Sequence, residues 1–520
     1  MKFGIALLCG AALWASGALS RVQAQSSVID TLYIFTATSG SDSNNLDGAF
    51  PECPLLLLGA DLFGTAINGG TEGNGSVFAI RTNGLGFTNI HSFSAGDTNA
   101  SGLYTNIDGA NPFAGLVISG NTLFGTTASG GSAGSGTVFS VNTDGSGFTN
   151  LHNFPAISGS PFFANIDGAN PLAGLVLLGN TLYGTAQNGG NAGNGTVFSL
   201  NTNGSGFSVL HSFSSGATND ALENYTNSDG AIPVAALILS GNTLFGMAEY
   251  GGTGASGTVF SINIDNHDFT NLYNFTANTY DPVLGLYLNS DGAYPISGLI
   301  LSGNTLYGTA QNGGTNGTGT IFSLDTNDLV FTLLYAFSAP NYNAEQQDYT
   351  NTDGFFPVAP LLLSGGTLYG TAQDGGGADI GTVFSINTDG SDFTTLYNFS
   401  LGADNASGVY TNSDGALPVA GLILSGSTLF GTTAVGGNQG DGTVFALTLA
   451  AQPSLGIVLS GSDVTISWPA SASAYVLQTT TDLAAGNWSD ITSGITTVGA
   501  NNVFTAATGG QAALFRLQQQ

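Results

Sequence analysis

Basic residues are almost absent from this chain. Its 520 residues include 4 Lys or Arg against 33 Asp or Glu, and only 7% of all residues are charged. Nucleic-acid binding depends on Lys and Arg that neutralise phosphates, and anionic lipid attracts basic segments. Such a charge repels nucleic acid and disfavours anionic lipid, whereas cations and neutral ligands such as glycans remain compatible with it.

The usual catalytic signatures are also missing. The chain has two cysteines, Cys9 and Cys53, and contains no H-E-x-x-H or C-x-x-C motif, nor a G-x-S-x-G motif on a strand-to-helix turn. Glycine-rich loops such as Asn188–Gly195 are followed by neither Lys nor a helical pattern, so they are not phosphate loops. No stretch has a sustained helical period, which excludes a helical fold.

The first 24 residues have the pattern of a secretory signal peptide. Lys2 precedes an apolar run from Phe3 to Leu19, and small residues precede a predicted cleavage site after Ala24. The run is short for a membrane span and no stop-transfer pattern follows, although a retained anchor is the alternative. Cleavage would change the formal net charge from −29 to −31 and leave a mature chain without a transmembrane segment.

A repeat of about 61 residues fills most of the chain between this segment and residue 449. The motif L-[FY]-G and the companion motif G-[TS]-[VI]-F both occur seven times in register. A fixed period of this kind indicates a stack of similar structural units. The L-[FY]-G copies begin at Leu62, Leu123, Leu182, Leu244, Leu306, Leu368 and Leu429.

Each repeat predicts four β-strands. In the third repeat these are the apolar run Pro171–Leu178, then Thr181–Ala186, Thr196–Leu200 and Phe207–Phe213. Thr, Val, Leu and aromatic residues fill the runs, and Asn, Gly, Asp and Ser separate them, as in strands and turns. Four-stranded units stacked in series are typical of a β-propeller.

The two ends of the repeated region predict a closed ring. The seventh repeat stops at Leu447 without its fourth strand, whereas an unmatched fourth strand, Thr31–Phe35, precedes the first repeat. An N-terminal strand that completes the last sheet would remove both open edges. We therefore predict an all-β fold, a seven-bladed β-propeller closed in this way, over residues 25–449. A solenoid, whose ends do not meet, is the alternative.

The repeat resembles a known family. The segments G-T-V-F-S-L-N-T-N-G-S-G-F and D-G-A-x-P-x-A-G-L-x-L-x-G-N-T-L-[FY]-G-T are similar to the GloVer (Gloeobacter–Verrucomicrobia) tandem repeat of bacterial exported proteins, over about residues 28–448. The resemblance implies a protein that is secreted or lies at the surface of a bacterium. It implies no catalytic activity.

The tail after the repeats predicts a second, smaller domain. Residues 450–455 form a linker, and residues 456–520 contain short strand patterns such as V-T-I-S-W-P and A-Y-V-L-Q-T-T. These segments resemble the fibronectin-III-like end modules of exported proteins, which implies a small β-sandwich. Trp468 and Trp488 are expected to be core anchors of this module.

Histidine is the first candidate for acid–base chemistry. His91, His152 and His211 share one repeat position with tyrosines, which predicts a packing position with a polar tip. His267 lies alone in a turn. The tyrosines of this position are Tyr33, Tyr273, Tyr335 and Tyr397.

The motif N-x-D-G is the candidate for metal binding. It is a good turn former, because Asn and Asp bond to nearby backbone and Gly tolerates a positive φ. Its oxygens would also suit Ca²⁺, although the spacing is too short for a full calcium loop. Turn and calcium site both remain open. The aspartates are Asp47, Asp108, Asp167, Asp229, Asp291, Asp353 and Asp414.

An aromatic residue precedes this motif in six repeats and is the candidate for ligand binding. We expect these loops to gather on one face around the propeller axis, where rings beside Asn and Asp could bind a glycan. The alternative is that each ring fills the groove between neighbouring blades. The six residues are Tyr104, Phe163, Tyr225, Tyr287, Tyr349 and Tyr410.

Together these patterns predict a monomeric, non-enzymatic binding or surface protein, with neutral glycan or a cell-envelope component as its partner. No cofactor is expected, apart from the open question of Ca²⁺. One alternative is an extracellular carbohydrate-active enzyme that uses loop carboxylates in the axial cleft. Another is a purely structural envelope protein.

Overall fold

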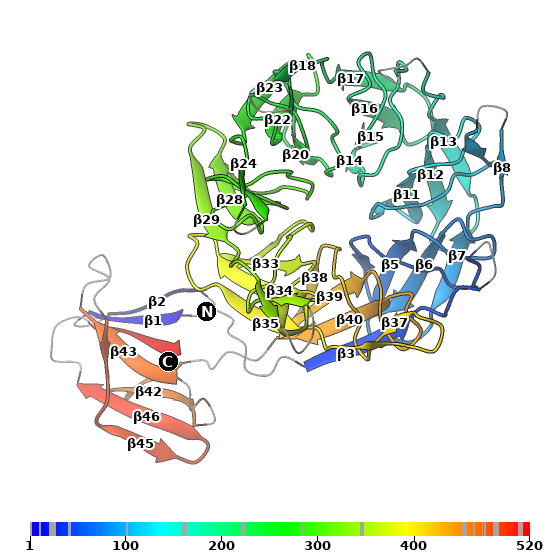
Figure 1. The fold of residues 1–520 in the computed structure, drawn as a ribbon. Coiled ribbons are helices and arrows are strands. Elements are labelled where there is room, and N and C mark those ends of the chain that lie inside the picture. The colour runs from blue at the N-terminus through cyan, green and yellow to red at the C-terminus, as the bar shows by residue number, and fades with distance from the viewer. Residues whose placement is uncertain are drawn as a thin grey trace. The chain divides into compact units, whose positions relative to one another are not determined.

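The computed structural model describes two compact units (Figure 1). The repeat unit comprises Ser27–Leu363 and Leu368–Thr448, and the terminal unit comprises Met1–Ser26, Ser364–Thr367 and Leu449–Gln520. The described residues are 3–9, 12–19, 28–39, 43–99, 102–158, 164–219, 224–282, 285–343, 348–449, 455–460, 463–470, 472, 475–481, 488–507 and 513–519.

Strands dominate both units. The one helix among the described residues is the short 3-10 helix η1 (Gly376–Ala378). Within these ranges no helix has the length and apolar character needed to cross a membrane.

Seven four-stranded antiparallel sheets build the repeat unit, as far as it is described. The first three are β4 (Leu56–Leu58), β5 (Asp61–Ala66), β6 (Ser76–Arg81) and β7 (Thr88–Ser92); β10 (Val117–Ser119), β11 (Thr122–Thr127), β12 (Thr137–Asn142) and β13 (Thr149–Asn153); and β14 (Val176–Leu178), β15 (Thr181–Ala186), β16 (Thr196–Asn201) and β17 (Ser208–Ser212).

The other four sheets repeat this order. They are β20 (Ile238–Ser240), β21 (Thr243–Ala248), β22 (Thr258–Asn263) and β23 (Phe269–Asn274); β26 (Ile300–Ser302), β27 (Thr305–Ala310), β28 (Thr320–Asp325) and β29 (Phe331–Ala336); β32 (Leu362–Ser364), β33 (Thr367–Ala372), β34 (Thr382–Asn387) and β35 (Thr394–Asn398); and β38 (Ile423–Ser425), β39 (Thr428–Thr433), β40 (Thr443–Thr448) and β3 (Val28–Ile34). The all-β, propeller-like architecture is confirmed.

The two sequence motifs of the repeat, L-[FY]-G and G-[TS]-[VI]-F, lie opposite each other on paired strands. In the third sheet Gly184 of L-Y-G lies opposite Phe198 of G-T-V-F. A Cβ atom on Gly184 would come within 2.7 Å of the Phe198 ring, so any larger residue would displace that buried ring. The same close approach recurs in all seven repeats, and glycine is therefore required beside each phenylalanine.

Neighbouring sheets share buried cores around the ring. A buried phenylalanine follows the fourth strand of each sheet. Phe213, for example, packs with residues of its own sheet and of the next one. A threonine hydrogen bond adds a second link, as where Thr185 Oγ1 donates to the carbonyl of Ala235 in the following repeat. Each sheet is thus held to the next by both apolar and polar contacts.

The same two contacts join the last sheet to the first. Strand β3 pairs with β40 from Val28–Thr448 to Ile34–Thr443, and Phe35 packs in one cluster with Leu62 of the first repeat. Thr432 Oγ1 donates to the carbonyl of Cys53, at 3.3 Å. The predicted completion of the last sheet by the N-terminal strand is confirmed, and the repeat unit is a closed ring (Figure 1).

In the described parts of the chain five small hairpins connect successive sheets, and they were not predicted from the sequence. Their strands are two or three residues long and rich in Asn, Thr and Asp, so they lack an alternating apolar pattern. They are β8 (Asp97–Thr98) with β9 (Tyr104–Thr105), β18 (Ala217–Asn219) with β19 (Asn224–Thr226), β24 (Thr279–Asp281) with β25 (Leu286–Leu288), β30 (Asn341–Asn343) with β31 (Asp348–Thr350), and β36 (Ala403–Asp404) with β37 (Tyr410–Thr411).

The terminal unit contains a four-stranded and a three-stranded sheet besides the pair β1 (Phe3–Cys9) and β2 (Ala12–Leu19). Ile466 and Trp468 of one sheet are buried in a single cluster with Leu477 and Phe515 of the other. Trp468 is buried in this cluster, as expected of a core anchor. Trp488 is half-buried and lies outside the cluster, with its ring centroid 4.3 Å from the guanidinium carbon of Arg516. The sheets are β41 (Gly456–Ser460), β42 (Asp463–Pro469), β46 (Asn501–Ala507) and β45 (Ile495–Val498), and β44 (Ser489–Asp490), β43 (Tyr475–Thr480) and β47 (Leu514–Gln519).

Candidate functional site

Six of the seven aspartates of N-x-D-G accept hydrogen bonds from the end of the preceding sheet, that is, from its fourth strand and the residues just after it. Asp291 is 3% exposed, and its carboxylate accepts bonds from the Tyr273 hydroxyl at 2.7 Å and from the Thr276 amide at 3.0 Å. The Thr276 hydroxyl donates to the other carboxylate oxygen. We call the seven aspartates the latch aspartates, because they fasten the end of one sheet to the loop that begins the next.

The histidine–tyrosine position supplies the ring that bonds to every latch aspartate except Asp167. The bonds join Tyr33 to Asp47, His91 to Asp108, His211 to Asp229, Tyr335 to Asp353 and Tyr397 to Asp414, at 2.7–3.0 Å. Each of these rings except Tyr397 also stacks on a phenylalanine of the following repeat, as His211 does on Phe269 with centroids 3.9 Å apart. A packing position with a polar tip is therefore confirmed.

The pKa shifts follow from this geometry. Burial alone would raise the pKa of Asp108, but hydrogen bonds from His91 and Ser94 outweigh it and hold the pKa below its ordinary value. Asp229 is shifted in the same direction by His211 and Ser214. Burial and the bond to Asp291 raise the pKa of Tyr273 well above its ordinary value. At neutral pH the two aspartates are therefore held as carboxylates and Tyr273 as a neutral phenol.

The asparagines of N-x-D-G have all their polar atoms engaged. Asn289 Oδ1 accepts bonds from the amides of Gly292 and Gly314, and its Nδ2 donates to the carbonyls of Thr276 and Gly292. Among the described residues, no group of three or more His, Cys, Asp or Glu side chains could hold a metal ion. The seven aspartates lie in separate repeats, and the carboxylate oxygens of all but Asp167 accept hydrogen bonds from protein donors.

One latch aspartate has fewer partners than the others. At the junction of the second and third repeats Pro155 stands where the other junctions have Ser or Thr, and proline offers neither an amide hydrogen nor a hydroxyl. His152 Nε2 lies 3.3 Å from Asp167 Oδ2 without hydrogen-bond geometry. Asp167 is correspondingly more exposed than Asp108 or Asp229.

The six candidate aromatic residues do not behave alike. The Tyr104 and Tyr410 hydroxyls accept bonds from Asn74 Nδ2 and the Gly402 amide, so these two rings are tied to neighbouring backbone and side chains. Tyr225 lies in β19, and Phe163 lies outside the described residues. Hairpins β8–β9 and β18–β19 lie at the outer edge of the ring, not around its axis as expected (Figure 1).

Two neighbouring hairpins instead present pairs of exposed tyrosines. On β24–β25 the rings of Tyr280 and Tyr287 are 5.2 Å apart, and on β30–β31 those of Tyr342 and Tyr349 are 5.4 Å apart. Tyr287 and Tyr349 are 56% and 55% exposed. Aromatic faces held in pairs at the surface are suited to bind the apolar faces of sugar rings.

Tyr349 also lines a cavity of about 580 Å³. No shared site was visible here from the sequence, because the lining comes from several loops of two adjacent repeats. The other lining residues are Gly285, Leu286, Thr318, Pro340, Phe355, Phe356, Asp374 and Asp379.

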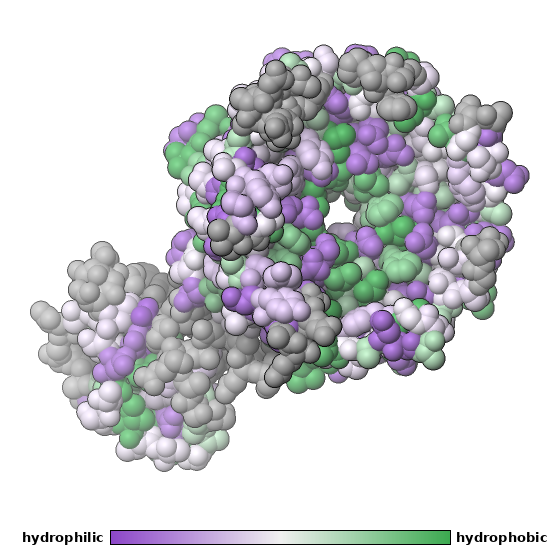
Figure 2. Space-filling model, viewed as in Figure 1, coloured by the Kyte–Doolittle hydropathy of each residue, from purple (hydrophilic) through white to green (hydrophobic). Residues whose placement is uncertain are grey.

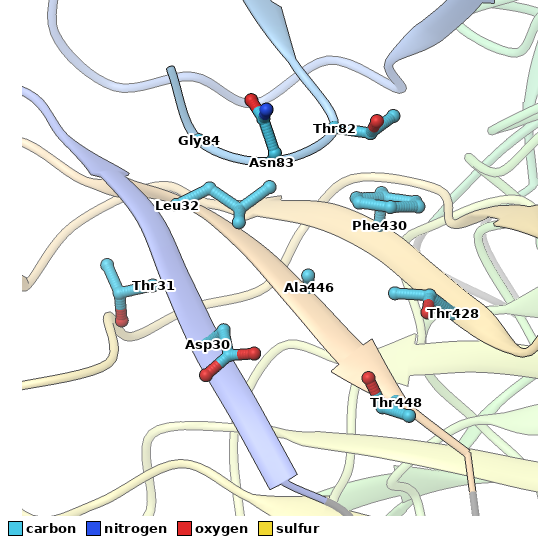
Figure 3. A pocket seen from close by; sticks show the side chains of 10 residues that line it. All are labelled: Asp30, Thr31, Leu32, Thr82, Asn83, Gly84, Thr428, Phe430, Ala446 and Thr448. Carbon is cyan, nitrogen blue, oxygen red and sulfur yellow. The ribbon is translucent and has the colours of Figure 1, made fainter. Parts of the chain in front are cut away.

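A second cavity, of about 420 Å³, lies at the closure of the ring. It is bounded by β3, β39, β40 and the turn Thr82–Gly84, and its lining includes Asp30, Leu32 and Phe430 (Figure 3). Asp30 is the one charged side chain among its described lining residues, so this cavity offers little chemistry. At the centre of the ring the space-filling view shows an opening bordered by hydrophobic and hydrophilic residues (Figure 2).

Fold and site together define an all-β protein of tandem, propeller-like repeats. Residues 98–221 and 214–350 match the family model described as the Gloeobacter/Verrucomicrobia repeat. The chain carries this repeat, which confirms the resemblance of its motifs. No curated protein matches the chain.

Several solved structures resemble the chain at low identity. Oligogalacturonate lyase from Vibrio parahaemolyticus is 8% identical, with a TM-score of 0.46, over 86% of this chain and 97% of its own. TolB from Acinetobacter baumannii is 11% identical (TM-score 0.31; 61% and 58%), and a gluconolactonase from Xanthomonas campestris is 12% identical (TM-score 0.31; 60% and 79%). At these values none of them assigns a ligand or reaction to this chain.

Proposed function

We propose that this protein is an exported, non-enzymatic binding protein for neutral glycan. In this proposal the seven sheets are the blades of a seven-bladed β-propeller, and residues 456–520 form a fibronectin-III-like sandwich module. The observation that carries the proposal is the pair of tyrosine hairpins, Tyr280 with Tyr287 and Tyr342 with Tyr349. Rigid aromatic surfaces stack on sugars without the help of basic side chains, of which this chain has very few.

A glycan array tests this function. The mature chain, residues 25–520, is applied with and without a chelator, and we expect binding to neutral glycans under both conditions. A variant with alanine at the four tyrosines should lose the signal. Leu85→Ala with Leu401→Ala, which truncates two exposed apolar side chains elsewhere, is the control and should bind as the wild type does. An array without any bound glycan contradicts the proposal and favours a purely structural envelope role.

Export is part of the proposal and has its own test. The signal-peptide pattern of residues 1–24 supports a location outside the cytoplasm, secreted or at the cell surface. Mass spectrometry of protein recovered from the medium or the envelope should find Gln25 as the first residue. A chain that remains in the cytoplasm with its first 24 residues would contradict export. We also expect a monomer in light scattering.

A carbohydrate-active enzyme is the second candidate. The observation in its favour is that Asp374 and Asp379 line one cavity, and paired carboxylates are what glycoside hydrolysis needs. The wild type would then release reducing ends from a polysaccharide, and Asp374→Asn and Asp379→Asn would each abolish the release. We expect no release from neutral polysaccharides, and release that depends on both aspartates would replace the first proposal.

A further inference from the structure

The cavity at Tyr349 is built by residues that depart from the repeat. Phe355 occupies a position where each of the other six repeats has alanine. Asp379 stands where five other repeats have glycine and the fourth has alanine. Asp374 replaces an asparagine that three repeats have. The equivalents of Phe355 are Ala49, Ala110, Ala169, Ala231, Ala293 and Ala416.

These three residues are held together by the backbone. Phe355 and Asp374 lie opposite each other in an antiparallel bridge, with hydrogen bonds of 2.9 and 3.2 Å between their main chains. Asp379 Oδ1 accepts a bond from the Gly375 amide at 2.9 Å. Glycine is needed at 375, because a Cβ there would come within 2.6 Å of the Phe355 ring. The three residues that depart from the repeat therefore lie next to one another.

The lining divides into an apolar and a polar part. Phe355 is 7% exposed and meets Phe356 edge to face, with centroids 4.9 Å apart. Tyr349 stands at the exposed rim. Asp374 and Asp379 add carboxylate oxygens, and Thr318 adds a hydroxyl. Aromatic faces beside a few hydrogen-bond acceptors are the surroundings that a pyranose ring requires, with apolar C–H faces and donating hydroxyls.

The charge of the lining narrows the ligand further. Two carboxylates line the cavity, and the sequence has no Lys or Arg between Arg81 and Arg516. A uronic acid or a phosphorylated sugar would therefore meet repulsion from both carboxylates and from the net charge of the protein. A volume of about 580 Å³ lies within the usual range for small-molecule sites.

We propose that this cavity is a single binding site for an uncharged sugar residue of a glycan, which stacks on the aromatic lining and donates hydroxyl hydrogen bonds to Asp374 and Asp379. This inference rests on the proposed glycan-binding function and deepens it. It places one specific site where the fifth and sixth repeats meet. The exposed tyrosine pairs then form the approach to this site, not a series of equivalent sites.

The test uses a variant that restores the residues of the other repeats. Phe355→Ala, Asp374→Asn and Asp379→Gly together remove the aromatic base and both carboxylates, and each new residue already occurs at that position in other repeats. The fold should persist, since Asp379 has a φ of 58° that glycine adopts readily. Asp144→Asn is the control, because the next repeat has Asn203 there and the turn is exposed.

Calorimetric titration with neutral oligosaccharides from the array gives the readout. We expect one site per chain in the wild type and in Asp144→Asn, and affinity at least about tenfold weaker in the triple variant, in line with the loss of a stacked ring and its hydrogen bonds. Oligouronates should bind at least about tenfold more weakly than the matching neutral oligosaccharides.

Three outcomes would overturn the inference. Equal affinity of the triple variant and the wild type would leave glycan binding in place but move it away from this cavity. A stoichiometry near six or seven would indicate repeat-equivalent sites. Preference for uronates would contradict the role of the two carboxylates. Absence of binding to every glycan would instead reject the proposed function itself.

Discussion

His152 Nε2 lies 3.3 Å from Asp167 Oδ2 at the one junction between repeats where Pro155 removes the two donors that other latch aspartates receive. Asp108, by comparison, accepts bonds from the amide and hydroxyl of Ser94 as well as from His91. The third repeat therefore carries the weakest latch of the ring, and its partners can be restored or removed by single substitutions.

Pro155→Ser should stabilise the repeat unit. Serine adds an amide and a hydroxyl donor to a carboxylate, which outweighs the lost rigidity of proline, and we expect a gain of about 1 kcal/mol in the free energy of unfolding. Denaturant unfolding measures it. Ser214→Pro in the next repeat is the matched reverse change and should lower the stability. A Pro155→Ser variant that is less stable than the wild type would contradict the latch.

His152→Tyr should reduce the loss of stability on mild acidification. Burial lowers the pKa of His152 below its ordinary value, although Asp167 partly offsets this. The unfolded chain therefore binds a proton more readily, and wild-type stability falls as the pH drops below about 6.5. Tyrosine, which fills this position in four other repeats, does not titrate there. Unfolding curves at pH 7 and pH 5 should show a smaller difference for the variant.

Removal of the closing strand should destabilise the ring strongly. Deletion of Val28–Thr36 exposes the edge of β40 and removes Phe35, which is fully buried. The single change Phe35→Ala should already cost about 3–5 kcal/mol, whereas truncation of the exposed Leu85 to alanine should cost about 0.5 kcal/mol or less. Thermal unfolding measures both. An unchanged melting curve after the deletion would reject closure by β3.

Chelation should leave the melting temperature unchanged. The oxygens of Asp291 accept bonds from Tyr273 and Thr276, so they are occupied by protein donors and not arranged around a cation. Asp291→Asn should still lower the free energy of unfolding by about 1–3 kcal/mol, because the NH₂ group of the asparagine side chain would face the hydrogen-bond donors of Tyr273 or Thr276. Calorimetry with EDTA and with added Ca²⁺ checks this. A rise in melting temperature with Ca²⁺ would favour the calcium alternative.

The strands were predictable where the repeat itself encodes them. Thr181–Ala186 and Tyr475–Thr480 match the observed β15 and β43, since β-branched and aromatic residues are bounded there by turn residues. The first strand of each repeat was predicted too long: Pro171–Leu178 contains only β14 (Val176–Leu178). The segment that leads into β14 is a loop whose backbone hydrogen-bonds to the preceding repeat instead of to a neighbouring strand. The Asn170 amide, for example, donates to the Ser135 carbonyl.

The site was predictable only in part, because its contacts cross repeats. The equivalence of His211 and Tyr273 was visible in the sequence, but their bonds to Asp229 and Asp291 come from folding of the following loop. An alignment of the repeats by their shared residues also draws attention away from a residue that occurs in only one of them. Phe355 was the available signal, as the one phenylalanine in a column of alanines.

Closure by β3 also sets the order in which the molecule can be completed. The ribosome makes β3 before any other strand of the ring, but its partner β40 is made only after six further sheets. Each sheet can form as its repeat emerges, whereas the last sheet waits for residues 443–448. A nascent chain interrupted within the seventh repeat would present unpaired strand edges, which proteases and chaperones recognise. The arrangement thus distinguishes finished chains from unfinished ones.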